Sequence, residues 1–191
     1  MHVTVQDVVK FWFDSANQAH WFARHDAFDE QIHTDFGVAL HAARAGELEH
    51  WVETPTGWLA LLILLDQFGR NCYRNDARAF VADAHAQKLA CAGIARGHDM
   101  ALEPHQRVFT YLPLEHSEDL QLQQRSVGLF TALCEQAGPS DRALFENYLG
   151  YARRHHEVIA RFGRFPHRNA LLGRANTPEE NEYLAQPGAG F

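Results

Sequence analysis

The sequence predicts an all-α protein of about eight helices arranged in antiparallel hairpins, because short connections favour antiparallel neighbours. Residues that cap helices recur along the chain, apolar residues follow a helical period, and no alternating apolar and polar run predicts a strand. The chain has 191 residues, of which 46% are hydrophobic, so it can bury a core as a single domain over residues 1–191. Residues 186–191 are expected to form a tail.

The first four predicted helices each begin at a side chain that can cap a helix. Gly46 and Gly97 follow two of them at positions where a helix typically stops. Residues 58–65 are apolar on every side, so the helix that contains them is expected to be the buried centre of the fold. The predicted ranges, each given from its cap, are 4–13, 26–44, 54–67 and 76–95.

Four more helices are predicted in the second half of the chain. Ser117 is expected to cap one of them, with Glu118 and Asp119 in its first turn. Residues 177–180 read Thr-Pro-Glu-Glu, a capping box with proline at the first helical position, and form the clearest helix start in the chain. The predicted ranges are 104–112, 117–136, 139–162 and a last helix from 177.

Charge is distributed unevenly along the chain, whose net charge is −7. The segment 142–174 carries seven Arg against two acids, a net charge of +5, which leaves −12 for the rest. Arg is suited to bidentate pairing with carboxylate or phosphate, so this segment either pairs with the acidic part of the chain or holds an anion. A nucleic-acid partner is not expected, because an acidic protein repels a polyanion.

Neither a membrane span nor an export signal is predicted. The longest apolar run, residues 58–65, is far shorter than the roughly 20 residues that a span needs. The N-terminal residues lack a basic region followed by an apolar stretch, so no signal peptide is expected. The three cysteines show no CxxC spacing, which favours reduced thiols and a cytoplasmic location.

Standard catalytic signatures are absent from the sequence. It contains no Walker A loop, no GxGxxG, no GxSxG and no HExxH motif. No cofactor and no metal site are predicted, catalytic residues are not assigned, and whether the protein is an enzyme stays open.

The first polar motif, residues 66–74, begins where the most apolar predicted helix ends. Asp66 is expected to be buried there, so it must be paired, with Arg70 or with an Arg of the basic segment as partner. Arg70 and Asn71 are alternatively ligand-binding residues. Cys72 lies between two Arg, which can favour its thiolate.

Two further motifs lie later in the chain. In residues 111–119, His116 is the residue that helix capping does not explain, and it is either structural or a site residue. In residues 161–174, Arg, His and Asn gather behind a helix end at Gly163. His155 lies on the apolar face of the preceding helix, as a hydrogen-bonded core residue or as part of a site.

These motifs resemble the bacterial domain-of-unknown-function 924 family over nearly the whole chain. The matching stretches are LLDQFGRNCYR, YLPLEHSEDLQLQ and FGRFPHRNALLGRANTPEE, in the order typical of the family. Gly69 stands where the family usually has proline, which is expected to loosen the turn after the central helix. Glu115 replaces the usual Met and adds a charge beside His116. The resemblance implies a tetratricopeptide-like helical fold and no assigned activity.

Two functional hypotheses follow. In the first, a polar pocket binds a small anionic ligand through Arg70, Asn71, His116, His155, Arg164, Arg168, Asn169 and Arg174. In the second, the protein is a non-enzymatic helical scaffold that binds a peptide or a partner protein. Its Arg motif is then a structural clasp that pairs with Asp66, Glu118 and Asp119. Arg and His side chains that face solvent favour the pocket, whereas paired and buried ones favour the scaffold. The oligomeric state is not predicted.

Overall fold

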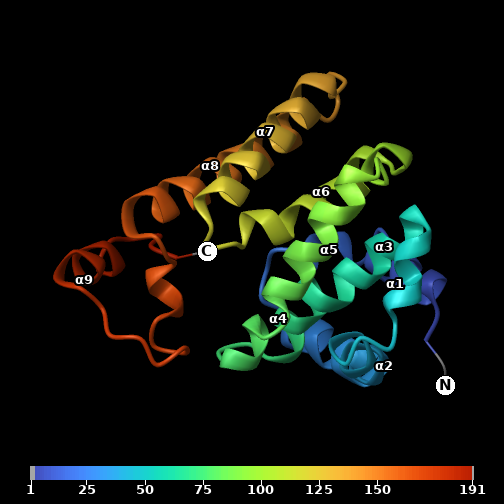
Figure 1. Cartoon of the computed structure of the whole chain (residues 1–191), viewed down its shortest axis with the longest axis horizontal. Helices are drawn as coiled ribbons and strands as arrows, with labels where there is room; N and C mark the ends of the chain where they lie inside the picture. The colour runs from blue at the N-terminus through green and yellow to red at the C-terminus, as the bar shows by residue number, and fades with distance from the viewer. Residues whose placement is uncertain (1–2, 191) are drawn as a thin grey trace. The chain divides into compact units, whose positions relative to one another are not determined.

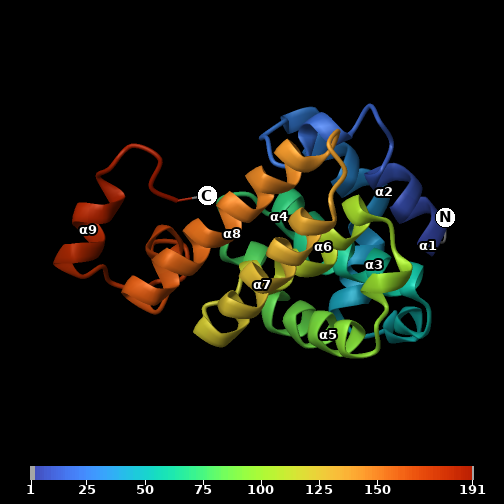
Figure 2. The ribbon, with the colours of Figure 1, turned by 90° about the horizontal axis from the view of Figure 1, so that it is seen from above.

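The computed structural model describes residues 3–190, which form helices joined by turns and short 3-10 segments, with no strand among them (Figures 1 and 2). The predicted all-α class is confirmed. The described chain divides into two compact units that meet in the sequence between Pro113 and Leu114. The single domain over residues 1–191 stays a prediction. None of the described helices is long and apolar enough to cross a membrane.

The first unit packs its helices around a cluster of aromatic rings. Trp12 lies at the centre of this cluster, with ring centroids 5.5 Å from Phe68 and 5.4 Å from Phe109. All three side chains are buried, so they join the first, third and last helices of the unit. The helices of this unit are α1 (Val5–Trp12), α2 (Asp26–Arg44), α3 (Pro55–Leu62), α4 (Gly69–Cys72), α5 (Asp83–Ala95) and α6 (Pro104–Glu115). The last two residues of α6 belong to the second unit.

The central helix is buried, as predicted, but it is longer than expected. Thr54 caps α3 through a hydrogen bond from the Gly57 N–H, and the helix then continues as a π-helical segment over residues 63–68. The residues from Gly57 to Gly69 are all buried. The expected end near residue 67 and the loose turn at Gly69 are wrong, because Gly69 is itself helical and begins α4. Asp66 therefore lies inside a continuous helix.

Helix starts in the first unit differ from the predictions in two places. The cap of α2 is His25, whose Nδ1 accepts a hydrogen bond from the Phe28 N–H at 3.1 Å, so Asp26 takes the first helical position. Asp76 caps a short 3-10 turn (Ala77–Phe80) rather than α5. The long helix begins only at Asp83. In both places a neighbouring side chain or a short turn satisfies the backbone groups that the predicted cap was expected to satisfy.

The second unit is built on a helical hairpin. Its helices are α7 (Leu120–Gln136), α8 (Arg142–Phe162) and α9 (Pro178–Leu184). Figures 1 and 2 both show α7 and α8 lying side by side and antiparallel, and they pack together extensively. This hairpin agrees with the expected antiparallel neighbours, whereas the tetratricopeptide-like array stays a prediction.

The helix starts of the second unit are partly as predicted. The capping box at Thr177 is confirmed, since the Thr177 hydroxyl accepts from the Glu180 N–H and the Glu180 carboxylate accepts from the Thr177 N–H. The cap of α7 is Asp119, which accepts from two backbone N–H groups, and not Ser117. Ser117 is buried two residues earlier, where its hydroxyl accepts from the Asp119 N–H at 3.1 Å. A turn over residues 138–141 delays the start of α8.

The predicted tail begins after α9 and folds back on that helix. The Gly190 N–H lies 3.4 Å from the Tyr183 hydroxyl, which accepts its hydrogen bond. The last residue of the predicted tail, 191, lies outside the described residues.

Candidate functional site

The arginine motif follows the C-terminal end of α8. Gly163 ends this helix with φ = 69°, a left-handed conformation that strains residues with a Cβ. A 3-10 turn (Pro166–Arg168) comes next, and α9 starts ten residues after it. Between these helices the chain has little regular structure, so side-chain contacts must hold it in place.

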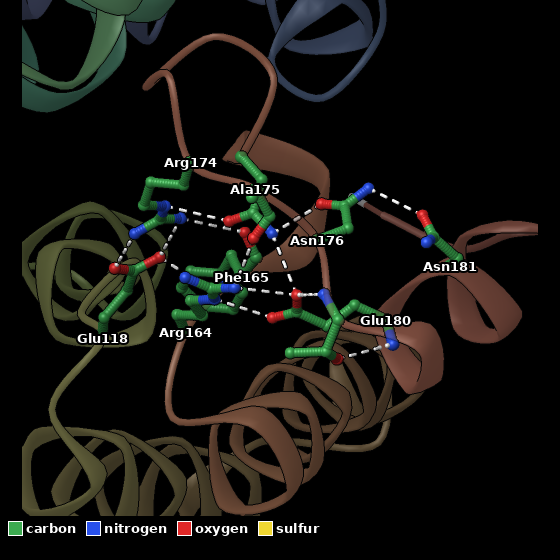
Figure 3. A network of polar contacts seen from close by, with 10 residues as sticks. Glu118, Arg164, Phe165, Arg174, Ala175, Asn176, Glu180 and Asn181 are labelled. Carbon is green, nitrogen blue, oxygen red and sulfur yellow. Dashed lines mark hydrogen bonds and ion pairs between the residues drawn. The ribbon is translucent and has the colours of Figure 1, made fainter.

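Arg164 makes the first of these contacts, with Glu180 on α9 (Figure 3). Its Nε and Nη2 donate to the two carboxylate oxygens at 2.7 and 2.8 Å, a bidentate pair. Glu180 is 2% exposed and also accepts hydrogen bonds from the Thr177 N–H at 2.7 Å and from the Asn169 amide at 3.3 Å. The hydrogen bond from Arg164 is the main reason why the pKa of Glu180 falls to about 2.

Arg174 makes the second contact, with Glu118 in the turn before α7 (Figure 3). Its Nη1 and Nη2 donate to the carboxylate at 2.6 and 2.9 Å, and the Phe165 N–H donates to the same carboxylate at 2.8 Å. Burial raises the pKa of Glu118, but the hydrogen bonds from Arg174 and Phe165 outweigh it and leave this pKa below its ordinary value. Arg174 Nε also donates to the Asn169 amide oxygen at 2.9 Å.

Arg168 and Asn169 are both buried, and Asn169 contacts a member of each ion pair. Arg168 is 6% exposed, donates from Nη1 to the His116 carbonyl at 3.1 Å, and places its guanidinium 4.3 Å from the centre of the Phe165 ring. Asn169 is fully buried and donates to the Asn176 amide oxygen at 2.7 Å. Arg168 thus attaches this segment to the backbone at His116, and Asn169 links the two ion pairs. We refer to Glu118, Arg164, Arg168, Asn169, Arg174 and Glu180 as the clasp.

His155 forms a buried pair with Glu115 beside the clasp. Its Nδ1 lies 2.9 Å from the Tyr151 carbonyl and 3.1 Å from Glu115 Oε1, and both oxygens are acceptors, so Nδ1 carries the proton. Nε2 then keeps its lone pair. Burial, with the nearby His116 ring at 6.1 Å, lowers the pKa of His155 to about 2, so the imidazole is neutral.

Arg70 and Asn71 lie in the first unit, where both are engaged with carboxylates. Arg70 Nη2 donates to Asp66 at 3.1 Å and to Asp83 at 3.2 Å, which confirms that Asp66 is paired with an Arg. The Gln67 amide also donates to Asp66 at 2.5 Å. Asn71 donates to an Asp29 oxygen at 2.7 Å. Asp66 is 1% exposed, so these contacts satisfy a charge that has almost no water around it.

Cys72 is not an activated thiol. Burial raises its pKa to about 11 despite the nearby charge of Arg44, so the thiol stays protonated at neutral pH. Among residues 3–190, no group of three or more His, Cys, Asp and Glu side chains is placed to hold a metal ion.

The structure therefore brings six of the predicted site residues into the second unit, namely His116, His155, Arg164, Arg168, Asn169 and Arg174. Of the three acids predicted to pair with the arginine motif, Glu118 does so. The prediction is wrong for Asp66, which pairs with Arg70, and for Asp119, which caps α7. Sequence reasoning missed Glu180 as a clasp residue and Glu115 as the partner of His155. The capping box located Glu180, but nothing in the local sequence signals that its carboxylate also binds Arg164.

This fold and this site define a class of protein that is all-helical and pairs its arginines internally. Residues 8–188 match the family of bacterial proteins of unknown function called DUF924, and the chain belongs to this family. This chain is similar to a solved structure, that of the protein of unknown function ATU0120 from Agrobacterium tumefaciens. The two are 42% identical with a TM-score of 0.86, over 96% of this chain and 97% of that one. No curated protein matches this chain.

The pairing of Asp66 leads to a prediction about stability. Asp66→Ala leaves Arg70 with one carboxylate fewer in a buried setting, so it should lower the free energy of unfolding by roughly 3–5 kcal/mol in urea denaturation. Asp35→Ala on the exposed side of α2 is the control and should change it by about 0.5 kcal/mol or less. Equal effects of the two substitutions would show that the Asp66 contacts contribute nothing.

The lowered pKa values of the clasp carboxylates predict a loss of stability in acid. Above the ordinary value of 4.5 the ionised carboxylates stabilise the folded state, and this contribution disappears as the pH falls toward about 2 for Glu180. Glu180→Gln should therefore be less stable at pH 7 and lose less stability in acid than the unmodified protein, as measured by urea denaturation across this pH range. The exposed neighbour Glu179→Gln should behave like the unmodified protein, and an identical pH profile for both variants would contradict the assignment.

Proposed function

We propose that the protein is a helical scaffold that binds an acidic peptide segment of a partner protein, and that its arginine motif is a structural clasp. The observation that carries the proposal is the bidentate pairing of Arg164 with Glu180 and of Arg174 with Glu118. Guanidinium groups held in this way have few donors left for a ligand. The partner must then bind elsewhere.

The exposed face of α8 supports this proposal. Asn147, Arg154 and Arg161 recur every seven residues and are all exposed, so they form one stripe along the helix. Tyr151 is 41% exposed beside this stripe, and the Arg154 guanidinium lies 4.0 Å from the centre of its ring. We define these four residues as the α8 face, which offers two arginines and an aromatic ring to a partner, with the exposed Glu157 about one turn from each arginine.

The positive charge of the segment that contains α8 favours an acidic partner. The α8 face belongs to the segment of the chain with net charge +5, so an acidic peptide complements it. The protein as a whole carries −7, which opposes a long polyanion such as nucleic acid. We place the scaffold in the cytoplasm, and the free state of Cys72, Cys91 and Cys134 supports this location.

A second candidate function is the binding of a small anion by the polar residues that the sequence singles out. The Glu115–His155 pair adds little to it, because His155 is neutral, keeps a lone pair at Nε2 and has a pKa of about 2. The candidate ligand residues are Arg70, Asn71, His116, His155, Arg164, Arg168, Asn169 and Arg174. An anion that binds the motif must displace Glu118 or Glu180 from its arginine, which makes this candidate weaker than the scaffold.

Fluorescence anisotropy with a labelled synthetic peptide of alternating Glu and Leu residues tests the proposed scaffold. Removing two arginines from the α8 face in Arg154→Ala/Arg161→Ala should weaken binding by about five- to tenfold, because each exposed ion pair contributes up to about 1 kcal/mol. Binding to the unmodified protein should also weaken with salt.

The matched control is Arg24→Ala/Arg125→Ala, which changes the net charge equally at exposed positions outside α8. It should bind the peptide like the unmodified protein. Equal weakening in the two double variants would show non-specific attraction, and no binding by any of the proteins would overturn the proposed function.

A further inference from the structure

A cavity of about 220 Å³ in the first unit is lined by none of the clasp residues and by none of the site residues that the sequence predicts. It lies between the 3-10 segment Glu49–Glu53, α3 and α5. Its walls are mostly apolar, from Val52, Trp58, Leu89 and Ala92, and two cations, Lys88 and Arg96, also line it.

Trp58 gives the cavity a rigid wall. The side chain is 1% exposed, and its Nε1 donates to the Leu89 carbonyl at 2.8 Å. Gly93 allows this close approach, because a Cβ there would lie 2.1 Å from Trp58 Cε2. The His98 ring meets the indole edge-on, with centroids 5.9 Å apart. The indole is thus fixed before any ligand arrives, so binding requires little ordering of this wall.

The two cations lie on the same side of α5. Lys88, Ala92 and Arg96 are spaced four residues apart, so they follow one another along one face of the helix, and all three are exposed. Within the described residues, neither cationic side chain makes an ion pair or a hydrogen bond to the protein. Their separation of eight residues corresponds to about 12 Å along the axis, which long side chains can span to reach an acid group near Ala92.

Glu49 is the one acidic residue of the cavity lining, and its carboxylate is already engaged. His85 Nε2 lies 2.6 Å from Glu49 Oε1. The cavity therefore combines an apolar body, a fixed indole and an excess of positive charge at its edge. Such a combination suits a ligand with an apolar part and a negative group.

We propose that this cavity binds a small carboxylate with an aromatic or aliphatic body, of which phenylacetate is the simplest aromatic example. The ring packs against Val52 and Ala92, with Leu89 and the buried Trp58 indole behind them, and the carboxylate pairs with Lys88 and Arg96. This site is separate from the α8 face and from the clasp, so it does not depend on the function proposed above.

Calorimetric titration of the full chain with phenylacetate tests the site. The charge and the ring are both required, so phenylacetate should bind at least about tenfold more tightly than phenylacetamide, which lacks the charge, and than acetate, which lacks the ring. Equal affinity for phenylacetate and phenylacetamide would overturn the role of the cations.

Substitutions then locate the site. Lys88→Ala/Arg96→Ala changes exposed side chains only and should reduce phenylacetate affinity to that of phenylacetamide. Ala92→Trp, also at an exposed position, should block the cavity. The control Lys10→Ala/Arg125→Ala alters the net charge equally and should leave the affinity unchanged.

Two outcomes would overturn the proposal, namely phenylacetate binding that survives both cavity variants, or binding that falls equally in the control. The α8-face variant Arg154→Ala/Arg161→Ala should bind phenylacetate normally. Failure of the cavity is therefore distinguishable from failure of the scaffold.

Discussion

The two bidentate arginine–glutamate pairs of the clasp are the contacts on which the second unit depends. Arg174 joins the segment after α8 to the turn before α7, and Arg164 joins the same segment to α9. The four hydrogen bonds of these pairs all join charged partners in bidentate geometry, so they fix the position of a segment that has little regular structure of its own. The local apolar cluster of Val158, Ile159 and Phe165 is small by comparison.

The clasp also determines which polar groups can be buried. Asn169 is fully buried, and it is satisfied because the side chains of Arg174, Asn176 and Glu180 surround its amide. Removing either ion pair leaves such groups without their partners in a place that water barely reaches. A network of this kind rigidifies the C-terminal segment.

Local signals in the sequence predict much of this fold. The capping boxes and helix-ending glycines are properties of a few adjacent residues, so Thr177 and Gly163 are correctly assigned. Where two cap residues compete within three positions, as Ser117 and Asp119 do, the outcome depends on tertiary burial, and the sequence prediction is wrong. The π-helical stretch around Asp66 has no local signal of its own.

The candidate site is less predictable because its contacts join distant residues. Glu118 and Arg174 are 56 positions apart, and Arg164 and Glu180 are 16 apart. Composition indicates that the basic segment requires carboxylates, but several acids compete for that role, and the sequence does not select Glu180. Asp66 and Arg70 are the exception, since one turn of helix separates them and their pairing follows from spacing.

Thermal and urea unfolding of Arg174→Ala, with and without inorganic phosphate, tests the clasp most directly. A structural role predicts a loss of about 1.5–3 kcal/mol without any ligand. It also predicts that phosphate does not raise the Tm of the unmodified protein, and that the control Arg125→Ala changes stability by about 0.5 kcal/mol or less. Two results together would contradict a structural role. One is an Arg174→Ala variant as stable as the unmodified protein, and the other is phosphate that stabilises the unmodified protein, by about 2.7 kcal/mol at a hundredfold excess over its Kd, but not the variant.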